Sequence, residues 1–339
     1  MGISALERAG VSIPACTTRV KPRTQWLLAT VGTLASTAFA IAGLAPAAHA
    51  QQTHLLIVTG LAGEPQFAKT FKETAAALSD AARQKWGVAD SSLIVLGEDP
   101  ALDPTHVKFK STREEVARAF LTLSKRVAPG DVLFVFLNGH GSGEGPASRV
   151  NLPGADATAG EYATWLSGFS KQNVVFVIAG SGGGDFVPVL AGPGRVIVSA
   201  TRTAMERNES VFAAPFVKGL ASAEADSDKD GRISVIEAFT YAKKEVARVY
   251  EADKRMLTEH AILSDSALAR TVAFGGAQAS TNPKIIALVS ERQALESQVA
   301  SLRARKASME TTAYENELEK LLLAIAEKSA AIRAAGGKP

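Results

Sequence analysis

The stretch DVLFVFLNGHG, residues 131–141, decides the fold of this chain. One acidic residue and six apolar residues run directly into a turn of small residues that contains a histidine. An apolar run without polar alternation is typical of a strand whose two faces are both covered, as in a parallel sheet between layers of helices. The stretch therefore predicts a central strand of an α/β sheet, with His140 just beyond its carboxyl end.

Four further runs share this character, and amphipathic helical patterns separate them. The runs are His54–Thr59, Ser92–Leu96, Asn173–Ile178 and Arg195–Ala200, and the helical patterns are Phe67–Lys85, Thr112–Val127, Ala159–Phe169 and Val211–Ala223. Strands that alternate with helices predict a mostly parallel sheet with helices on both faces. We expect this α/β domain to span residues 51–279.

A second informative stretch is DSDKDGRISVIE, residues 226–237, which fills every position of the calcium-loop pattern D-x-[DN]-x-[DN]-G-x5-E. Gly231 provides the sharp turn, and Ile233 is the apolar residue that anchors such a loop. Ca²⁺ prefers six to eight oxygen ligands. The predicted ligands are the carboxylates of Asp226, Asp228, Asp230 and Glu237, the carbonyl of Arg232, and Ser234 directly or through water. The alternative is a solvent-exposed acidic loop between two helices that binds no metal ion.

The calcium loop lies between the helical patterns Val211–Ala223 and Val235–Tyr250. The sequence contains no second loop of this kind, although paired calcium loops normally brace each other. We therefore expect a solitary Ca²⁺ site within the α/β domain rather than an EF-hand sensor.

The N-terminal 50 residues have the pattern of a secretory signal. Basic residues Arg19, Lys21 and Arg23 precede an apolar run, Trp26–Leu44, and the sequence Ala-His-Ala ends at Ala50. This pattern predicts cleavage after Ala50 and export to the periplasm or medium of a bacterium, with no membrane span left. An uncleaved anchor is the alternative. The single cysteine, Cys16, would be removed, which leaves neither a disulfide nor a cysteine nucleophile.

The charge balance excludes one class of partner. Four of the 37 basic residues and one of the 34 acidic residues lie in residues 1–50, so the remainder carries 33 of each. A neutral chain without a basic patch interleaved with aromatic residues is not expected to bind nucleic acid.

Two glycine-rich turns follow neighbouring predicted strands, LNGHGSG at 137–143 and AGSGGGDF at 179–186. Carboxyl ends of parallel strands share one rim, so His140 and Ser181 are expected to lie near each other. A histidine base and a hydroxyl nucleophile, with the N–H groups of Gly141 and Gly182 as oxyanion donors, would form a catalytic arrangement.

Two weaker interpretations of the second turn stay open. It approximates the nucleophile elbow G-x-S-x-G, for which His260 is the only downstream histidine, with Asp226, Asp228 and Asp230 as acids in between. It also approximates a phosphate cradle, although the sequence has no G-x-x-x-x-G-K-[ST] motif there and no suitably placed lysine.

The pair His140–Gly141, followed by Ser181 at the end of the next strand, resembles the legumain and caspase-like superfamily of cysteine peptidases, especially its bacterial legumain-type proteins. The resemblance spans roughly residues 54–203, and residues 195–201 and 206–210 resemble the substrate-side strand and loop of that family. It implies a caspase-like fold, with Ser181 at the position of the catalytic cysteine.

Replacement of the catalytic cysteine affects the expected activity. A serine hydroxyl has a far higher pKa than a thiol and needs a strong base with a third, orienting group. No clear orienting residue is visible. We therefore expect a catalytically inactive homologue that binds or scaffolds a peptide or protein partner, and the alternative is a hydrolase that uses Ser181 with His140.

The C-terminal segment, residues 284–335, is rich in alanine, leucine and charged residues. Apolar residues recur at three-four spacing in two sets, Leu288, Leu295, Val299, Leu302 and Met309, then Leu318, Leu321, Leu322, Ile325 and Ile332. The sequence from Thr312 to Glu315 is typical of a capping box. We expect two helices, either a coiled-coil hairpin packed on its own domain or a coiled coil between chains.

Overall fold

The computed structural model describes residues 51–229, 231–275 and 282–336. The predicted signal peptide and Asp230 lie outside these ranges. Among the helices of the described ranges, none combines the length and apolar character that a membrane span requires.

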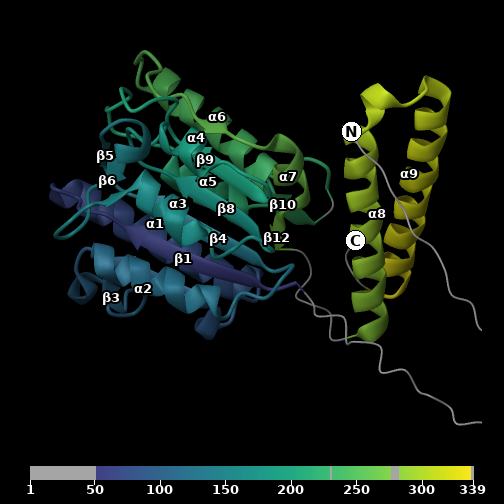
Figure 1. Cartoon of the computed structure of the whole chain (residues 1–339), viewed down its shortest axis with the longest axis horizontal. Helices are drawn as coiled ribbons and strands as arrows, with labels where there is room; N and C mark the ends of the chain where they lie inside the picture. The colour runs from purple at the N-terminus through teal and green to yellow at the C-terminus, as the bar shows by residue number, and fades with distance from the viewer. Residues whose placement is uncertain (1–50, 230, 276–281, 337–339) are drawn as a thin grey trace, which may run out of the picture. The chain divides into compact units, whose positions relative to one another are not determined.

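The domain is built on one seven-stranded sheet in the order β11-β9-β8-β4-β1-β2-β3 (Figure 1). All neighbours run parallel except β11, which is antiparallel to β9 at one edge. This confirms the predicted mostly parallel α/β sheet. The strands are β1 (Thr53–Thr59), β2 (Leu93–Gly97), β3 (Phe109–Lys110), β4 (Val132–Asn138), β8 (Asn173–Ile178), β9 (Arg195–Ser199) and β11 (Ile262–Leu263).

Helices cover both faces of this sheet. Along β4, Phe134 and Phe136 point to one face, while Leu133 and Val135 point to the other. The first face packs against α1 (Pro65–Lys85), α5 (Ala213–Ala221), α6 (Val235–Ala252) and α7 (Ser266–Thr271), and the second against α2 (Arg113–Ser124), α3 (Ala159–Leu166) and α4 (Phe186–Leu190). Two-sided burial is the physical reason for the unbroken apolar runs.

The strand order reverses between β1 and β4. From β1 the chain proceeds to β2 on one side, then returns to place β4, β8 and β9 on the other. In open α/β sheets such a switch point, beyond the carboxyl ends of the strands, is where ligands bind. The turns that contain His140 and Ser181 lie beyond the carboxyl ends of the strands next to this switch point, because they follow β4 and β8 directly.

Short elements surround the sheet, and the sequence did not predict them, since two or three residues have no measurable periodicity. They are the strands β5 (Gly141–Ser142), β6 (Arg149–Val150) and β7 (Ala157–Thr158) of a three-stranded sheet, the pair β10 (Arg232–Ser234) and β12 (Ala273–Gly275), and the 3₁₀ turns η1 (Asp90–Ser92), η2 (Pro100–Leu102), η3 (Gly145–Ala147) and η4 (Lys306–Ser308).

Strand β12 links the acidic loop to the main core. Ile233 of β10 is the antiparallel partner of Phe274, and both side chains are buried. The Phe274 ring lies 4.8 Å from Trp86 and 5.2 Å from Phe134, measured between ring centroids. Ile233 therefore anchors the loop as predicted. Its partner is β12, a strand near the end of the domain, and not a second calcium loop.

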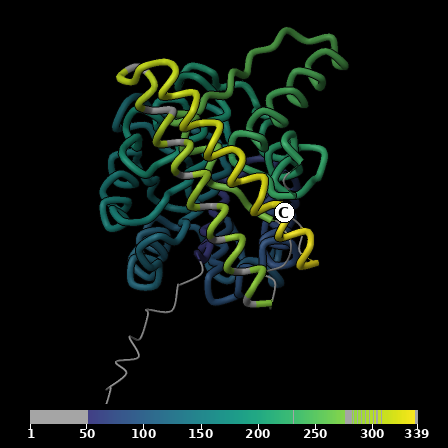
Figure 2. The backbone as a smooth tube through the Cα atoms, turned by 90° about the vertical axis from the view of Figure 1, so that its right-hand side faces the viewer, coloured from purple at the N-terminus to yellow at the C-terminus, as the bar shows by residue number. Residues whose placement is uncertain are grey.

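The C-terminal residues form two helices, α8 (Pro283–Ala304) and α9 (Thr311–Ala334), which run side by side (Figure 2). Val299, Leu302, Tyr314 and Leu321 form the buried centre of their contact. An ion pair between Lys328 Nζ and Glu291 Oε2, at 2.6 Å, adds to it. Pairing between chains as a coiled coil stays a prediction.

The start of α9 differs from the prediction. The Glu310 carboxylate accepts hydrogen bonds from the N–H groups of Thr312 and Ala313, at 3.0 and 2.8 Å. Glu310 is therefore the N-cap, and the predicted capping box from Thr312 to Glu315 is wrong. A glutamate just before the turn can reach the free N–H groups of the first turn, and its charge interacts favourably with the helix dipole.

We predict that Phe274→Ala lowers the free energy of unfolding by about 3–5 kcal/mol, because it removes a buried ring that packs on Trp86 and Phe134. Urea unfolding followed by tryptophan fluorescence measures this loss. The control is Phe109→Ala, since Phe109 is 54% exposed; we expect it to change stability by about 0.5 kcal/mol or less. Equal effects of the two substitutions would contradict the anchoring role of β12.

Candidate functional site

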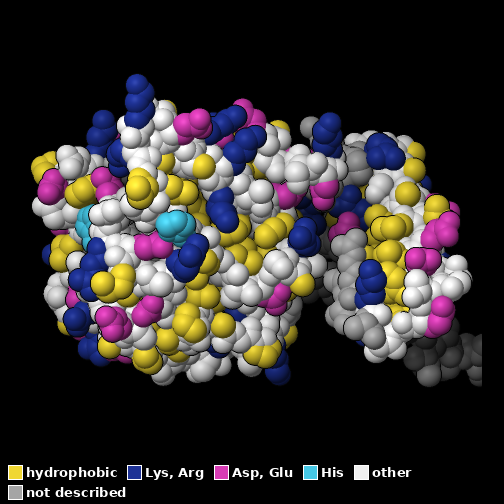
Figure 3. Space-filling view, turned by 90° about the horizontal axis from the view of Figure 1, so that it is seen from above, with side chains coloured by type: hydrophobic (Ala, Val, Ile, Leu, Met, Phe, Trp, Pro, Cys, Tyr) yellow, Lys and Arg dark blue, Asp and Glu magenta, His cyan; other side chains and the backbone are white. Residues whose placement is uncertain are grey.

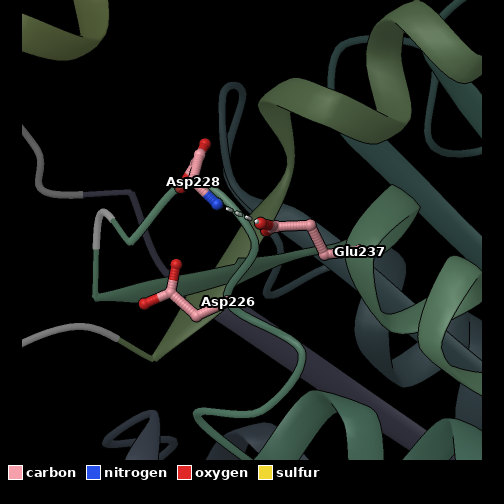
Figure 4. Close-up of side chains that lie close together, drawn as sticks. All are labelled: Asp226, Asp228 and Glu237. Carbon is pink, nitrogen blue, oxygen red and sulfur yellow. Dashed lines mark hydrogen bonds between the residues drawn. The ribbon is translucent and has the colours of Figure 1, made fainter.

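Three acidic side chains converge in the loop between α5 and α6. One carboxylate oxygen from each of Asp226, Asp228 and Glu237 lies within 4.8 Å of the other two. Figure 4 shows the three side chains close together. Calcium–oxygen distances are about 2.3–2.6 Å, so two ligands on opposite sides of one ion are separated by about 5 Å. The donor set and its spacing therefore fit Ca²⁺. The predicted ligand Asp230 lies outside the described residues.

Both carboxylate oxygens of Glu237 accept hydrogen bonds within this loop. Its Oε1 accepts hydrogen bonds from the Ser227 N–H and hydroxyl, both at 2.8 Å, and its Oε2 accepts from the Ser234 N–H at 2.9 Å and hydroxyl at 2.7 Å. Ser234 is also the N-cap of α6, so Glu237 and Ser234 form a capping box. The first turn of α6 thus holds Glu237 in place.

These hydrogen bonds set the charge of Glu237. Burial raises the pKa of this carboxyl, but the hydrogen bonds from Ser234 and Ser227 outweigh burial, and the net pKa lies below its ordinary value. The group is ionised at neutral pH. Its contribution to stability is present above the ordinary glutamate pKa and is lost as the pH falls through the lowered pKa.

The loop backbone has the predicted sharp turn. Gly231 has φ of 82°, a left-handed conformation that glycine adopts without strain, and its N–H donates to Asp226 Oδ2 at 2.9 Å. Arg232 belongs to β10, and its guanidinium donates to the carbonyl of Ala273 in β12 at 2.9 Å. The C-terminal half of the loop is therefore fixed by α6 and by β12.

The second candidate site is the rim where β4 and β8 end. The two strands are direct neighbours, and the Gly141 N–H donates to the Ser181 carbonyl at 3.0 Å. The structure thus brings the turns that contain His140 and Ser181 together, as the sequence predicts.

The His140 ring does not engage Ser181. It lies against α1, with centroids 4.8 Å from Phe67 and 5.5 Å from Phe71. Within the described residues, no hydrogen bond joins this ring to the Ser181 hydroxyl or to the side chain of Asn138, whose amide nitrogen is buried without a partner. A nucleophile needs its base within hydrogen-bond reach, and that contact is not formed here.

Both predicted oxyanion donors are engaged by backbone carbonyls. The Gly141 N–H donates to Ser181, and the Gly182 N–H donates to the carbonyl of Glu206 at 2.9 Å. An oxyanion hole requires N–H groups that point at the substrate oxygen. In this arrangement neither N–H can donate to a substrate oxygen unless the turns rearrange.

The rim glycines serve close backbone packing. A Cβ on Gly180 would lie 1.7 Å from the carbonyl oxygen of Gly139, and a Cβ on Gly184 would lie 2.2 Å from the backbone carbon of Arg202. The Gly183 N–H is also occupied, because it donates to Thr201 Oγ1 at 3.0 Å. These glycines bring loops into contact, and the alternative of an open phosphate cradle has no support in this geometry.

Asp185 joins three rim loops, and the sequence did not indicate this role. Asp185 accepts hydrogen bonds from the Gly145 N–H at 2.9 Å and from the Ala204 N–H at 3.2 Å. Its position directly after the glycine run was visible in the sequence. Its partners were not, because they lie about 20 and 40 residues away along the chain.

A second missed contact is the pair of His260 and Glu206. His260 Nδ1 lies 2.9 Å from Glu206 Oε1, next to the carbonyl of Glu206 that accepts from Gly182. In the nucleophile-elbow alternative, the acid for His260 was sought among the loop aspartates. The structure gives His260 a different partner, and no periodicity links two residues that are 54 positions apart.

Glu259 is a buried carboxylate that organises the start of α5. It accepts hydrogen bonds from the Ser210 hydroxyl at 2.6 Å and from the N–H groups of Val211 and Phe212 at 2.9 and 3.0 Å. Burial raises its pKa above the ordinary value, against the effect of these hydrogen bonds, and the charge of Glu206 adds to the rise. Its role is structural, since its oxygens face the helix start.

No family model and no curated protein matches the sequence. Among solved structures, the Drosophila initiator caspase Dronc aligns with a TM-score of 0.39 and 9% identity, over 63% of this chain and 79% of that chain. The caspase drICE aligns with a TM-score of 0.35 and 12% identity, over 60% and 86%. At such values neither structure assigns a family or an activity to this chain.

We predict that Gly180→Ala lowers the free energy of unfolding by about 3 kcal/mol, because the new methyl group collides with the Gly139 carbonyl. Thermal and urea unfolding measure the change. The matched control is Gly192→Ala, where the nearest atom to an added Cβ is Arg195 Cδ at 3.9 Å; we expect a change of about 0.5 kcal/mol or less. A tolerated Gly180→Ala would show that the rim is open.

Proposed function

We propose that this chain is an exported, calcium-binding protein with caspase-like or legumain-like organisation, without peptidase activity, that binds or scaffolds a peptide or protein partner. The observation that carries the calcium assignment is the convergence of Asp226, Asp228 and Glu237 within 4.8 Å. The sequence pattern of residues 226–237 supplies the remaining predicted ligands, Asp230, Arg232 and Ser234.

The role proposed for Ca²⁺ is structural. An ion held by the loop would neutralise three close carboxylates, whose mutual repulsion otherwise opposes folding. It would also tie α5 to α6, and through Ile233 and Phe274 to the core beneath β12. A ligand that binds only the folded state stabilises it by mass action. In an extracellular compartment with millimolar calcium, even a weak site of this kind would be occupied.

The absence of peptidase activity is proposed on three grounds. Serine replaces the thiol that the resembled family uses, and the His140 ring packs against Phe67 and Phe71 instead of contacting Ser181. In addition, the amides of Gly141 and Gly182 donate to backbone carbonyls. Base, nucleophile and oxyanion donors are each engaged elsewhere or out of reach, which favours a binding role.

Calcium is expected to raise the melting temperature of the purified chain relative to chelator, with a stabilisation of about 2.7 kcal/mol at a concentration one hundred times Kd. Glu237→Gln should abolish this calcium-dependent shift because it removes a bidentate anionic ligand. Thermal melts with chelator and with calcium, recorded for each variant, measure the shift.

The control for this experiment is Glu251→Gln, which removes the same charge from an exposed position on α6. It should retain the full calcium shift. The comparison is made within each variant, because Glu237→Gln also weakens the capping box with Ser234. Superimposed melts of the unsubstituted chain with and without calcium would refute the structural role.

The alternative function is a hydrolase in which His140 activates Ser181. It is favoured by one observation, the contact of 3.0 Å between the Gly141 N–H and the Ser181 carbonyl, which puts the two turns side by side. Activity would require the His140 side chain to leave its contacts with Phe67 and Phe71 on α1.

For an inactive protein, we expect no Ser181-dependent labelling by fluorophosphonate or acyloxymethylketone probes. Labelling is measured by intact mass for the unsubstituted chain and for Ser181→Ala. Labelling that disappears in Ser181→Ala would establish the hydrolase instead. Labelling that persists in that variant would arise from another residue and would leave Ser181 outside any mechanism.

A further inference from the structure

Helix α9 carries two stripes with three-four spacing, and only one of them faces α8. The first stripe consists of Tyr314, Leu318, Leu321, Ile325, Lys328 and Ile332, and it supplies the contacts with α8. The second stripe consists of Asn316, Lys320, Leu323, Glu327, Ala330 and Ala334. Two residues along a helix correspond to a rotation of about 200°, so Leu323 lies almost opposite the buried Leu321.

The second stripe is exposed. Leu323 is 58% exposed, in contrast to 7% for Leu321. Within the described part of the chain, neither Lys320 nor Glu327 takes part in an ion pair, although Lys328 on the first stripe does. Seen from above, the surface of the two helices shows apolar side chains beside basic and acidic ones (Figure 3). The stripe has the three-four spacing of a helix-pairing face, but its only large apolar residue is Leu323, which lies between a lysine and a glutamate.

The charges on the second stripe are self-complementary in one orientation only. Lys320 and Glu327 are equally far from the midpoint between Leu323 and Ala324. Two α9 helices that cross antiparallel at this midpoint would place each Lys320 opposite Glu327 of the second copy, with the leucines between them. A parallel pair in register would oppose lysine to lysine and glutamate to glutamate, which is destabilising.

We propose that the outer stripe of α9 is a homodimer interface, in which α9 packs antiparallel on α9 of a second copy of this chain. The arrangement forms two symmetric ion pairs and covers both Leu323 side chains. A two-fold interface is self-complementary by necessity, and this stripe meets that condition. With one leucine per helix and two exposed ion pairs, the dimer is weak and sensitive to salt.

Charge reversal tests the ion pairs. Lys320→Glu and Glu327→Lys are each expected to weaken the dimer about tenfold or more at low ionic strength, because a single substitution makes both symmetric pairs repulsive. The double variant should restore the affinity to within about threefold. The two single variants, weak alone, should form a mixed dimer when combined. Sedimentation equilibrium of the full chain over a concentration series measures each Kd.

A second set of variants tests the apolar contact. Leu323→Gln should weaken the dimer without lowering the melting temperature, since the side chain is exposed in the single chain. The matched control, Leu102→Gln, changes an equally exposed leucine at 54% on the α/β domain and should leave the dimer unchanged.

Disulfide trapping tests the orientation in a Cys16→Ser background. The antiparallel arrangement predicts cross-linking between Asn316→Cys and Ala330→Cys chains when they are mixed. It predicts none within Asn316→Cys alone, whose Cα atoms would be about 22 Å apart, too far for a disulfide.

Three results would overturn the proposal. The first is a chain that stays monomeric at all concentrations, which would indicate that another partner or the chain's own domain covers the stripe. The second is association that all charge reversals leave unchanged, as expected if a different surface associates. The third is self-cross-linking of Asn316→Cys, which would indicate parallel helices.

Discussion

Burial of the central sheet on both faces is the constraint on which the rest of this structure depends. Alternate residues of β4 point into two separate apolar layers, and both layers must be filled by helices before the strand can lose its contact with water. The connections between the long parallel strands therefore contain helices that pack on the sheet, whereas β2 and the short β3 are joined by a segment with only the 3₁₀ turn η2. The polar turns can emerge only at the strand ends, which is why all candidate residues lie at the edges of the domain.

This constraint also explains which parts of the fold were predictable. The five long strands and the helices α1, α2, α3, α5 and α6 were found from their apolar patterns, because burial dictates composition over several residues. The five-residue helix α4 between β8 and β9 was not found, since it is too short to show a periodicity. Strands β11 and β12 were not found, although Phe274 is central to the core, since their pairing depends on residues far away in sequence. The same holds for Asp185 and for the pair of Glu206 and His260, whose contacts span 19 to 54 positions.

The two candidate sites differ in how directly their residues determine geometry. In the acidic loop, ligand positions, the turn at Gly231 and the capping box of Ser234 and Glu237 all lie within twelve consecutive residues, so the local sequence fixes most of the arrangement. At the rim, the sequence identified His140 and Ser181 but could not show how their turns pack. The contacts of Gly139 with Gly180 bring backbone against backbone and leave the His140 ring on α1.

The pairing of β10 with β12 affects the order in which parts of the chain can fold during synthesis. Strand β10 closes the acidic loop, but its partner is made some forty residues later, at the end of the domain. A growing chain that stops before Ala273 has the loop residues without the strand that holds Ile233, and Phe274 is missing from the core. The loop can therefore adopt its final structure only after β12 has been synthesised, so it is among the last parts of the domain to fold.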